Sequence, residues 1–219
     1  RLYVETDAKR ISQICSHIGP KPMFIADGHH RFEVACQFRR WMQTQKPGDE
    51  SAGWNYVMTY FSDCVHNPFK IFPTHRLIRF PKGMSEPFCA LDDQVIFEKV
   101  KNLDEVLRRL SKNRQETRDK KYRFGLFTKK YGFFIMTLAD RLTRLVKKNP
   151  VDQLDVAVLH EMLLKPCFKI EAIEKSTAID FTRDAKVAVD KVKNGTFDAA
   201  FFLTPTSLNE MIVASKKGL

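Results

Sequence analysis

Five consecutive residues, Asp27-Gly28-His29-His30-Arg31, concentrate polar chemistry at the end of a short apolar run. Arg31 offers a planar cationic fork that suits phosphate oxygens, and the imidazoles of His29 and His30 can donate hydrogen bonds, transfer protons or ligate a metal. The carboxylate of Asp27 can hold Mg²⁺ or act as a base. These residue types predict a phosphate site, with Asp27, His29 and His30 as candidate catalytic residues and Asp27 as a candidate metal ligand.

The elements expected around this group would position it at the start of a helix. The apolar run at residues 22–26 predicts a buried strand, and apolar residues recur at helical spacing over residues 29–45. Gly28 would let the backbone turn tightly between them, and the unpaired amides of the first helical turn would point at an anion. The stretch therefore predicts phosphate binding by Gly28, His30 and Arg31. A purely structural role stays open, in which the carboxylate caps the helix and the histidines bond nearby backbone groups.

A second polar group, Thr74, His75 and Arg76, lies in a segment over residues 69–80 that is otherwise rich in aromatic and β-branched residues. That composition predicts a strand, in which alternation places Thr74 and Arg76 on one face and His75 on the other. Arg76 could then bind a phosphate beside Arg31, with Thr74 supplying a hydroxyl group. An edge strand with a wet polar face is an equal alternative, because a proline inside the segment cannot donate to a ladder.

Other reactive side chains have simpler explanations. Asp155 and His160 lie on a helix predicted over residues 151–164, and we leave both outside the site. Acidic residues in a first helical turn are explained by capping and by the helix dipole, and a single helical histidine is more often partly buried than a ligand. Cys36 lies among apolar residues of a helix, as core cysteines do.

The remaining pattern predicts an α+β protein with a mixed sheet and flanking helices. Further helices are expected at residues 7–18, 102–110, 183–193 and from 207, and further strands at 2–4, 54–61, 95–100, 122–127, 131–138 and 197–203. The strands at 54–61 and 69–80 could pair as neighbours. We predict an α/β core over residues 1–149 that carries the DGHHR loop, and a C-terminal α/β segment over residues 150–219 packed on it. A chain that begins at Arg1 is expected to be truncated, and we predict this at both ends.

Charge and composition narrow the class of partner. The 219 residues are 43% hydrophobic and carry a formal net charge of +11, so the chain can bury a core and favours anionic partners.

The sequence has no membrane-spanning run, no signal-peptide layout and an odd number of scattered cysteines, which together predict a cytoplasmic protein. Basic stretches at 108–121 and 141–148 make nucleic acid a less favoured partner, because acids interrupt the first and no aromatic residues interleave.

Several segments carry a resemblance to a known family. The run ADGHHRFE at residues 26–33 resembles the ADGHHRYE signature of the bacterial and archaeal family filed as domain of unknown function 1015. Three more segments look like parts of that family in the same order, FPTHR (72–76), LDVAVLHEMLL (154–164) and FDAAFFLTPTS (197–207). Collinear matches over most of the chain are far more specific than one pentapeptide.

A more remote resemblance implies a function. GHHRFEVA at residues 28–35 is similar to the Gly-x-x-Arg-x-x-Ala box of the ParB and sulfiredoxin superfamily, where the box lies at a helix N-terminus and holds nucleotide phosphate. The likeness to its free serine kinases implies a nucleotide-dependent enzyme that uses ATP or ADP with Mg²⁺ and phosphorylates a small hydroxyl-bearing metabolite. The likeness to its partition proteins implies a noncatalytic nucleotide- or nucleic-acid-binding module instead. A histidine occupies the place of the reactive cysteine of sulfiredoxin, so sulfinic-acid repair is not expected.

Overall fold

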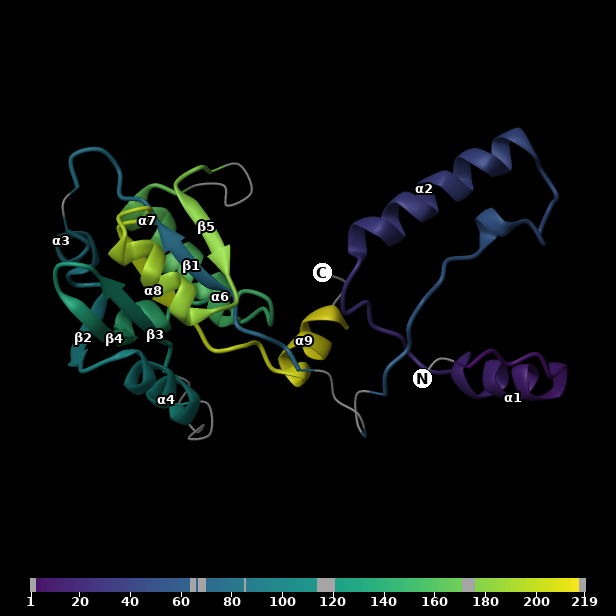
Figure 1. Ribbon diagram of the computed structural model, residues 1–219, viewed down its shortest axis with the longest axis horizontal. Coiled ribbons are helices and arrows are strands. Elements are labelled where there is room, and N and C mark those ends of the chain that lie inside the picture. Colours follow the sequence, from purple (N-terminus) through teal and green to yellow (C-terminus); the bar gives the residue numbers. More distant parts are fainter. Residues whose placement is uncertain are drawn as a thin grey trace. The chain divides into compact units, whose positions relative to one another are not determined.

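The computed structural model describes residues 3–63, 66, 70–84, 86–113, 121–170 and 176–216. The chain divides into two compact units, Arg1–Asp63 and Cys64–Leu219, which we call unit 1 and unit 2. Figure 1 shows two long helices in unit 1, and a sheet with flanking helices in unit 2.

Both long helices of unit 1 lie where the sequence predicts them. Helix α1 spans Ala8–Ile18 and begins at Asp7, whose carboxylate accepts hydrogen bonds from the first-turn amides at 2.8 and 3.3 Å. It ends at Gly19, as expected for a Gly-Pro pair. Helix α2 spans His29–Gln45, and its bounds are those predicted from the apolar spacing.

The strands predicted for unit 1 are wrong. Residues 22–26, expected as a buried strand, join no ladder, and their side chains are exposed or half-buried. Residues 54–61 likewise form no strand, because a short 3₁₀ turn, η1 at Gly53–Asn55, is followed by unpaired extended chain. Residues 3–4 also lie outside any strand, and Leu2 lies outside the described residues. These segments have strand composition, but a strand needs a neighbour to complete its hydrogen bonds.

Unit 2 is built on one sheet, whose strands are β1 His75–Ile78, β2 Val95–Val100, β3 Arg123–Thr128, β4 Gly132–Leu138, β5 Ile179–Thr182 and β6 Ala199–Phe202. Their order is β2-β4-β3-β6-β1-β5, and each pair of neighbours is antiparallel. The α+β class and the hairpin of β3 and β4 are confirmed. The mixed sheet is wrong, because the described strands pair only in the antiparallel sense.

Strand β1 is shorter than predicted and differently placed. A strand was expected over residues 69–80, but only His75–Ile78 form one. Phe69 lies outside the described residues. β1 pairs with β5 on one side and β6 on the other, so it is an interior strand and does not pair with residues 54–61. The alternative of an edge strand is therefore wrong.

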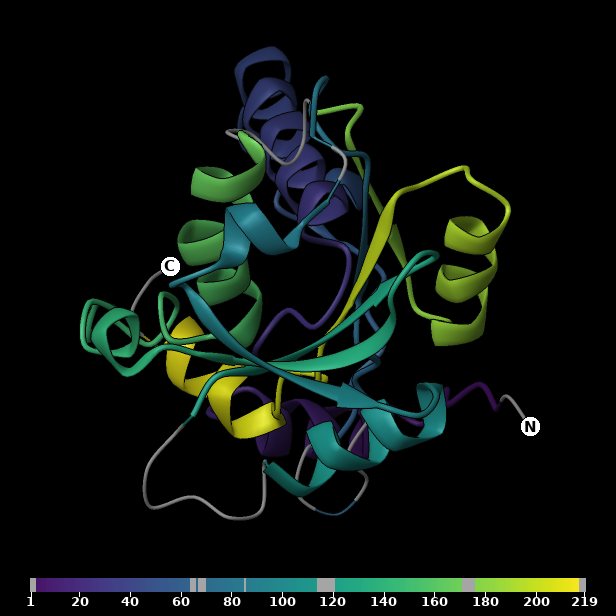
Figure 2. The same cartoon turned by 90° about the vertical axis from the view of Figure 1, so that its left-hand side faces the viewer.

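Helices cover both faces of this sheet (Figure 2). The helical elements of unit 2 are α3 Phe88–Leu91, α4 Leu103–Asn113, α5 Asp140–Thr143, α6 Asp155–Val158, the π-helical turn η2 Leu159–Leu164, α7 Lys165–Phe168, α8 Ala185–Lys193 and α9 Leu208–Ser215. The consecutive elements α6, η2 and α7 form one helical segment, residues 155–168, where a helix over 151–164 was predicted. Helix α9 begins at Ser207 with a reciprocal capping box to Glu210, and α8 begins at the capping residue Asp184.

The two faces of the sheet carry separate apolar cores. On one face, Phe124 and Phe201 pack with Leu159 and Leu163 of the 155–168 segment. On the other face, the sheet packs against α4 and α8. Gly125 in β3 faces α4, and a Cβ at this position would overlap Val106 and crowd Phe202. The close approach of α4 to the sheet therefore requires glycine here.

The sheet takes strands from both sides of the predicted boundary at residue 149. Strands β1 to β4 precede that position and β5 and β6 follow it, with β6 hydrogen-bonded to both β3 and β1. The charged stretch at 147–150 thus connects elements within unit 2, whereas the two compact units divide after Asp63.

Candidate functional site

The DGHHR loop (residues 27–31) begins helix α2 without a side-chain cap. Gly28 adopts the left-handed conformation, with φ 87° and ψ 26°, which favours glycine because it has no Cβ. Among the described residues no side chain accepts a hydrogen bond at this helix start, so the first-turn amides stay available to an external acceptor. The structural alternative, in which Asp27 caps the helix, is therefore wrong. Of the predicted strand, turn and helix, the turn and the helix are present.

Arg31 folds back over this turn. Its Nη2 donates a hydrogen bond to Asp27 Oδ2 at 3.0 Å, and a Cβ on Gly28 would lie 3.0 Å from the same nitrogen. The side chains of Arg31 and Asp27 are 80% and 92% exposed. An ion pair this exposed is worth little, so an anion of higher charge can replace the carboxylate at low cost.

The two histidines stand beside this pair. His30 Nδ1 lies 3.4 Å from Glu33 Oε2, and both side chains are exposed. Together with His29, the loop residues line a shallow open pocket. Within the described ranges no three His, Cys, Asp or Glu side chains are placed to hold a metal ion. Mg²⁺ at Asp27 therefore stays a prediction, in which a bound nucleotide would supply further ligands.

Thr74 and Arg76 lie in contact with each other in unit 2. Arg76 Nη1 donates a hydrogen bond to the backbone carbonyl of Thr74, so this contact does not use the threonine hydroxyl. The guanidinium lies 4.9 Å from the ring centroid of Phe181, the residue opposite it on β5. Burial lowers the pKa of Arg76 to about 10. Because Arg31 belongs to unit 1, binding of one phosphate by both arginines stays a prediction.

His75 points to the other face of the sheet, as strand alternation predicts. The side chain is 1% exposed, and its Nδ1 accepts a hydrogen bond from the Leu203 amide at 3.3 Å. Its ring meets Phe202 edge to face, with the centroids 5.2 Å apart. Burial lowers the pKa of His75 to about 4, with a further contribution from the Arg76 charge that outweighs the opposite effect of Asp184. At neutral pH His75 is therefore an uncharged hydrogen-bond acceptor.

The structure adds a pair that sequence reasoning left out. Thr204 Oγ1 donates a hydrogen bond to Asp155 Oδ2 at 2.6 Å, although Asp155 was explained as a capping residue. No side chain caps α6 among the described residues. Burial raises the pKa of Tyr122 to about 12, and the negative charges of Asp155 and Glu210 add to the shift, which indicates that these groups lie near one another.

These contacts join segments that are remote in sequence. The hydrogen bond between Leu203 and His75 joins segments 197–207 and 72–76. The hydrogen bond between Thr204 and Asp155 joins segments 197–207 and 154–164. The four segments that resemble the family could have identified the Asp155–Thr204 pair. Three of them, at 72–76, 154–164 and 197–207, meet at the end of β6. His160 on the π-helical turn is buried, close to the expectation of a partly buried residue, and its Nδ1 has no partner among the described residues.

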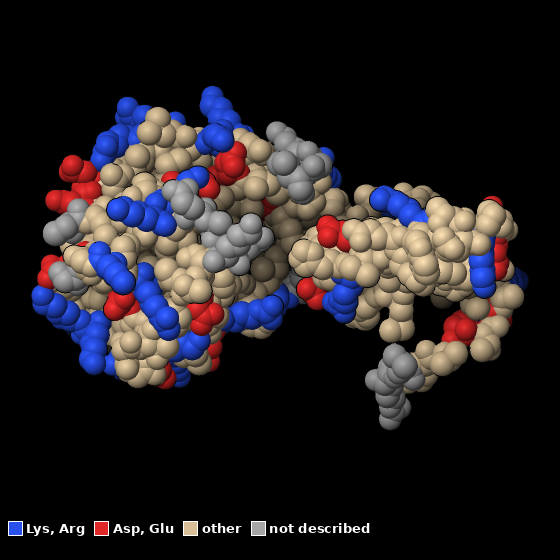
Figure 3. Space-filling model, turned by 90° about the horizontal axis from the view of Figure 1, so that it is seen from above, with Lys and Arg blue, Asp and Glu red and all other residues tan. Residues whose placement is uncertain are grey.

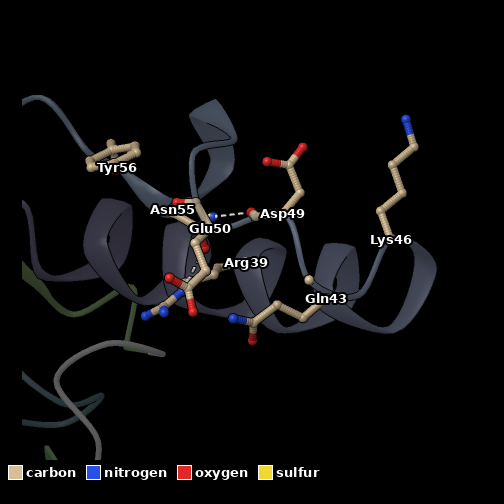
Figure 4. Close-up of a pocket in the computed structure, with 8 residues that line it drawn as sticks. Arg39, Gln43, Lys46, Asp49, Glu50, Asn55 and Tyr56 are labelled. Carbon is tan, nitrogen blue, oxygen red and sulfur yellow. Dashed lines mark hydrogen bonds between the residues drawn. The ribbon is translucent and has the colours of Figure 1, made fainter.

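A second pocket of unit 1 lies along the C-terminal half of α2 (Figure 4). The side-chain amide of Asn55 donates to the backbone carbonyl of Asp49 at 2.9 Å. Arg39 Nε in turn donates to Asn55 Oδ1 at 3.0 Å. The pocket is lined by Arg39, Gln43, Lys46, Gly48, Asp49, Glu50, Asn55 and Tyr56. Asn55 is thus hydrogen-bonded to Arg39 and to the backbone carbonyls of Asp49 and Glu50, which holds the loop that follows α2 against the helix.

Positive charge is concentrated in unit 2. This unit holds 29 of the 37 Lys and Arg residues and 19 of the 26 acidic residues, and Figure 3 shows the basic side chains spread over its surface. Part of the basic stretch at 108–121 is neutralised, because Arg109 pairs with Glu98 and Glu105. Residues 114–120 of that stretch lie outside the described residues.

Neither the helices nor known proteins give a further indication of function. Over the described part of the chain, no helix is both long and apolar enough to cross a membrane. Neither a curated protein nor a solved structure matches the chain.

One family model does match, and it covers residues 1–157. That range contains the DGHHR loop and the Thr74–Arg76 group, and it ends inside the helical segment 155–168. Strands β5 and β6 lie beyond it, although β6 is an interior strand of the sheet. Because the match includes most of the sequence, the chain belongs to the family described as protein of unknown function, DUF1015.

Proposed function

We propose that the DGHHR loop binds the phosphate groups of ATP or ADP with Mg²⁺, and that the protein phosphorylates a small hydroxyl-bearing metabolite. The observation that carries this proposal is the uncapped start of α2 behind a left-handed Gly28, with Arg31 folded over the same turn. Amides and a guanidinium directed to one place favour a phosphate group.

The Asp27–Arg31 ion pair suggests how the loop changes when nucleotide binds. A phosphate would replace the carboxylate as the partner of Arg31, because it carries more charge and can accept two hydrogen bonds from the guanidinium fork. Asp27 would then be released to hold Mg²⁺ or to orient the acceptor hydroxyl, while Arg31 and the amides stabilise the transferred phosphoryl group. His29 or His30 would transfer a proton or contact phosphate.

Nucleotide binding is tested by thermal-shift titration with ATP, ADP and CTP, with and without Mg²⁺. We expect stabilisation of the wild type of about 3 kcal/mol at a hundredfold excess over Kd, and at least a tenfold weaker Kd in Arg31→Ala. The matched control is Arg40→Ala, which removes an exposed arginine of the same helix outside the loop and should leave Kd unchanged. An absence of any nucleotide response in the wild type would reject the proposal.

Catalysis is tested by Asp27→Asn. The amide keeps the size of the side chain but loses the charge that binds Mg²⁺ or accepts a proton, so turnover should fall at least about a hundredfold while nucleotide affinity changes little. The measurement is transfer of labelled γ-phosphate to a panel of hydroxyl-bearing amino acids and sugars. Turnover that survives in this variant would remove the role assigned to Asp27.

A noncatalytic nucleic-acid-binding module is the second candidate, favoured by the concentration of positive charge in unit 2. Such a module would bind an oligonucleotide with an affinity that falls steeply as salt rises. Its affinity would depend on the Lys and Arg residues of the stretch at 108–121 more than on His29 or His30, and would be insensitive to Arg31→Ala. The same set of variants therefore separates the two candidates.

A further inference from the structure

Arg76 is a half-buried cation with no anionic partner among the described residues. It is the second residue of β1, and within the described ranges its guanidinium makes one hydrogen bond, from Nη1 to the backbone carbonyl of Thr74. Burial lowers its pKa, and no carboxylate of the described residues opposes this effect. Because a charge is costly to withdraw from water unless an opposite charge compensates for it, this position favours the binding of an anion.

Two other arginines of unit 2 are compensated in ways that Arg76 is not. Arg109, whose side chain is 31% exposed, forms ion pairs with both Glu98 and Glu105. Arg79 lies over a phenylalanine ring at 4.9 Å, as Arg76 does, but it is exposed to water. Arg76 is thus partly withdrawn from water like Arg109, but without the carboxylates that balance the charge of Arg109.

The donors that Arg76 has available lie on one edge of its guanidinium. Because Nη1 is engaged by the Thr74 carbonyl, Nε and Nη2 have no hydrogen-bond partner among the described residues. Neither nitrogen is sealed from solvent, since within the described ranges the buried side-chain atom without a partner is His160 Nδ1. The Nε–H bond and one Nη2–H bond point in the same direction, so a carboxylate can accept one hydrogen bond from each.

The surroundings leave this edge accessible. Strand β5 lies beside β1 at the end of the sheet (Figure 1), and its residue opposite Arg76, Phe181, is 39% exposed. The contact of the guanidinium with the Phe181 ring orients the arginine side chain. Thr74 shares the face of Arg76 by strand alternation, and its hydroxyl group makes no hydrogen bond to another described residue. This hydroxyl group can supply a further donor to the same anion.

We propose that Arg76 and Thr74 form a binding site in unit 2 for the carboxylate of a small organic acid. Nε and Nη2 of Arg76 hold the two carboxylate oxygens, and the Thr74 hydroxyl group donates to one of them. The rest of the acid extends into the solvent at this end of the sheet. Because the site is built from unit 2 alone, it does not depend on the DGHHR loop or on the phosphoryl transfer proposed above.

Donor number and shape favour a carboxylate over a phosphate at Arg76. A carboxylate is planar and is matched by two parallel N–H bonds from one guanidinium. A phosphate carries more charge and is typically bound by the amides of a helix start together with cations, as at the uncapped start of α2 beside Arg31. Helix α8 begins shortly after β5, but its first-turn amides already donate to Asp184 at 2.8 and 3.3 Å. The two arginines therefore suit different anions.

Titration of the full chain with acetate, at constant ionic strength, tests the proposal. The side-chain Nε–H signals of arginine are followed in ¹H–¹⁵N NMR spectra, and the Arg76 signal is identified by its loss in Arg76→Lys. We expect this signal to shift downfield and to saturate with a Kd of about 1–10 mM, a range that suits so small a ligand. Acetamide, which has the size of acetate but no charge, should cause no shift. The Arg79 signal is the internal control, because its Nε already donates to the Thr196 carbonyl.

Two variants test whether the guanidinium edge is required. Arg76→Lys keeps the positive charge but cannot present two parallel donors, so it should weaken acetate binding about tenfold, measured at the Phe181 amide signal. The matched control is Arg79→Lys, on the same chain segment and beside a phenylalanine ring, which should leave the Kd unchanged. Equal circular dichroism spectra show that both variants remain folded.

Three outcomes would overturn the proposal. Acetate could leave the Arg76 signal in place, or it could shift the Arg79 signal equally, which would indicate a general effect of anions on surface arginines. Tighter binding of inorganic phosphate than of acetate would reject the carboxylate and favour the phosphate predicted from the sequence. Arg31→Ala should leave the acetate titration unchanged, so this result is independent of whether the DGHHR loop binds nucleotide.

Discussion

Replacing Phe201 with alanine is expected to lower the free energy of unfolding of unit 2 by about 3–5 kcal/mol. Phe201 is fully buried in β6, opposite Arg76 on β1 and Leu126 on β3. Its ring meets Phe168 edge to face, with the centroids 5.8 Å apart. The truncation would therefore open a cavity between the sheet and the 155–168 segment. Urea denaturation followed by far-ultraviolet circular dichroism measures the change.

Two variants show whether this loss comes from the cavity. Phe201→Leu retains most of the volume and should cost about 1 kcal/mol. Phe72→Ala removes a ring that is 52% exposed, and it should change the unfolding free energy by at most about 0.5 kcal/mol. If Phe201→Ala lowered the free energy of unfolding no more than Phe72→Ala does, Phe201 would not be buried at the centre of the sheet.

The stability of unit 2 should decrease by about 3 kcal/mol between pH 6.5 and pH 4 because of His75 alone. The pKa of His75 is about 4 in the folded chain and 6.5 as the ordinary value. Between these values the unfolded chain binds a proton that the folded chain does not, so acid favours unfolding. The contribution of His75 is fully present above pH 6.5, is lost progressively as pH falls, and is gone below pH 4. Urea denaturation at several pH values measures this dependence.

Comparison with His75→Gln isolates this residue from the other titrating groups. Glutamine keeps an acceptor for the Leu203 amide but does not titrate, so its unfolding free energy should depend less on pH. The two pH profiles should converge towards acid and separate by about 3 kcal/mol towards neutral pH, apart from a constant offset. Parallel profiles would show that His75 protonates as easily in the folded chain as in the unfolded one.

Elements with local signals could be predicted from the sequence, whereas pairings between distant segments could not. Helix α1 has a capping residue and a terminating glycine, α2 has regular apolar spacing, and β3 and β4 are joined by a short turn. Residues 54–61 have the same aromatic and β-branched composition as the true strands but find no partner. The place of β6 depends on residues more than 70 positions away along the chain, which no local pattern encodes.

In the candidate site, too, the contiguous part could be predicted from the sequence and the contacts between distant segments could not. The DGHHR loop could be predicted because its residues are contiguous and lie at a helix start. The contact between Asp155 and Thr204 spans 49 residues, and a helical Asp near a first turn already had an adequate local explanation. Arg76 was expected to bind a phosphate, and this stays a prediction; the structure places its guanidinium over the Phe181 ring, a contact with a distant strand that no local pattern indicates.

The position of β6 also sets an order of events during synthesis on the ribosome. Although β6 follows the other described strands in sequence, it is the strand that joins β3 to β1. Until residue 202 has emerged, the β2-β4-β3 ladder can form, but β1 has no partner in it, and the edges of β1 and β3 remain open. Before β6 emerges, the nascent chain therefore presents open apolar strand edges, which a chaperone can bind or a neighbouring nascent chain can pair with.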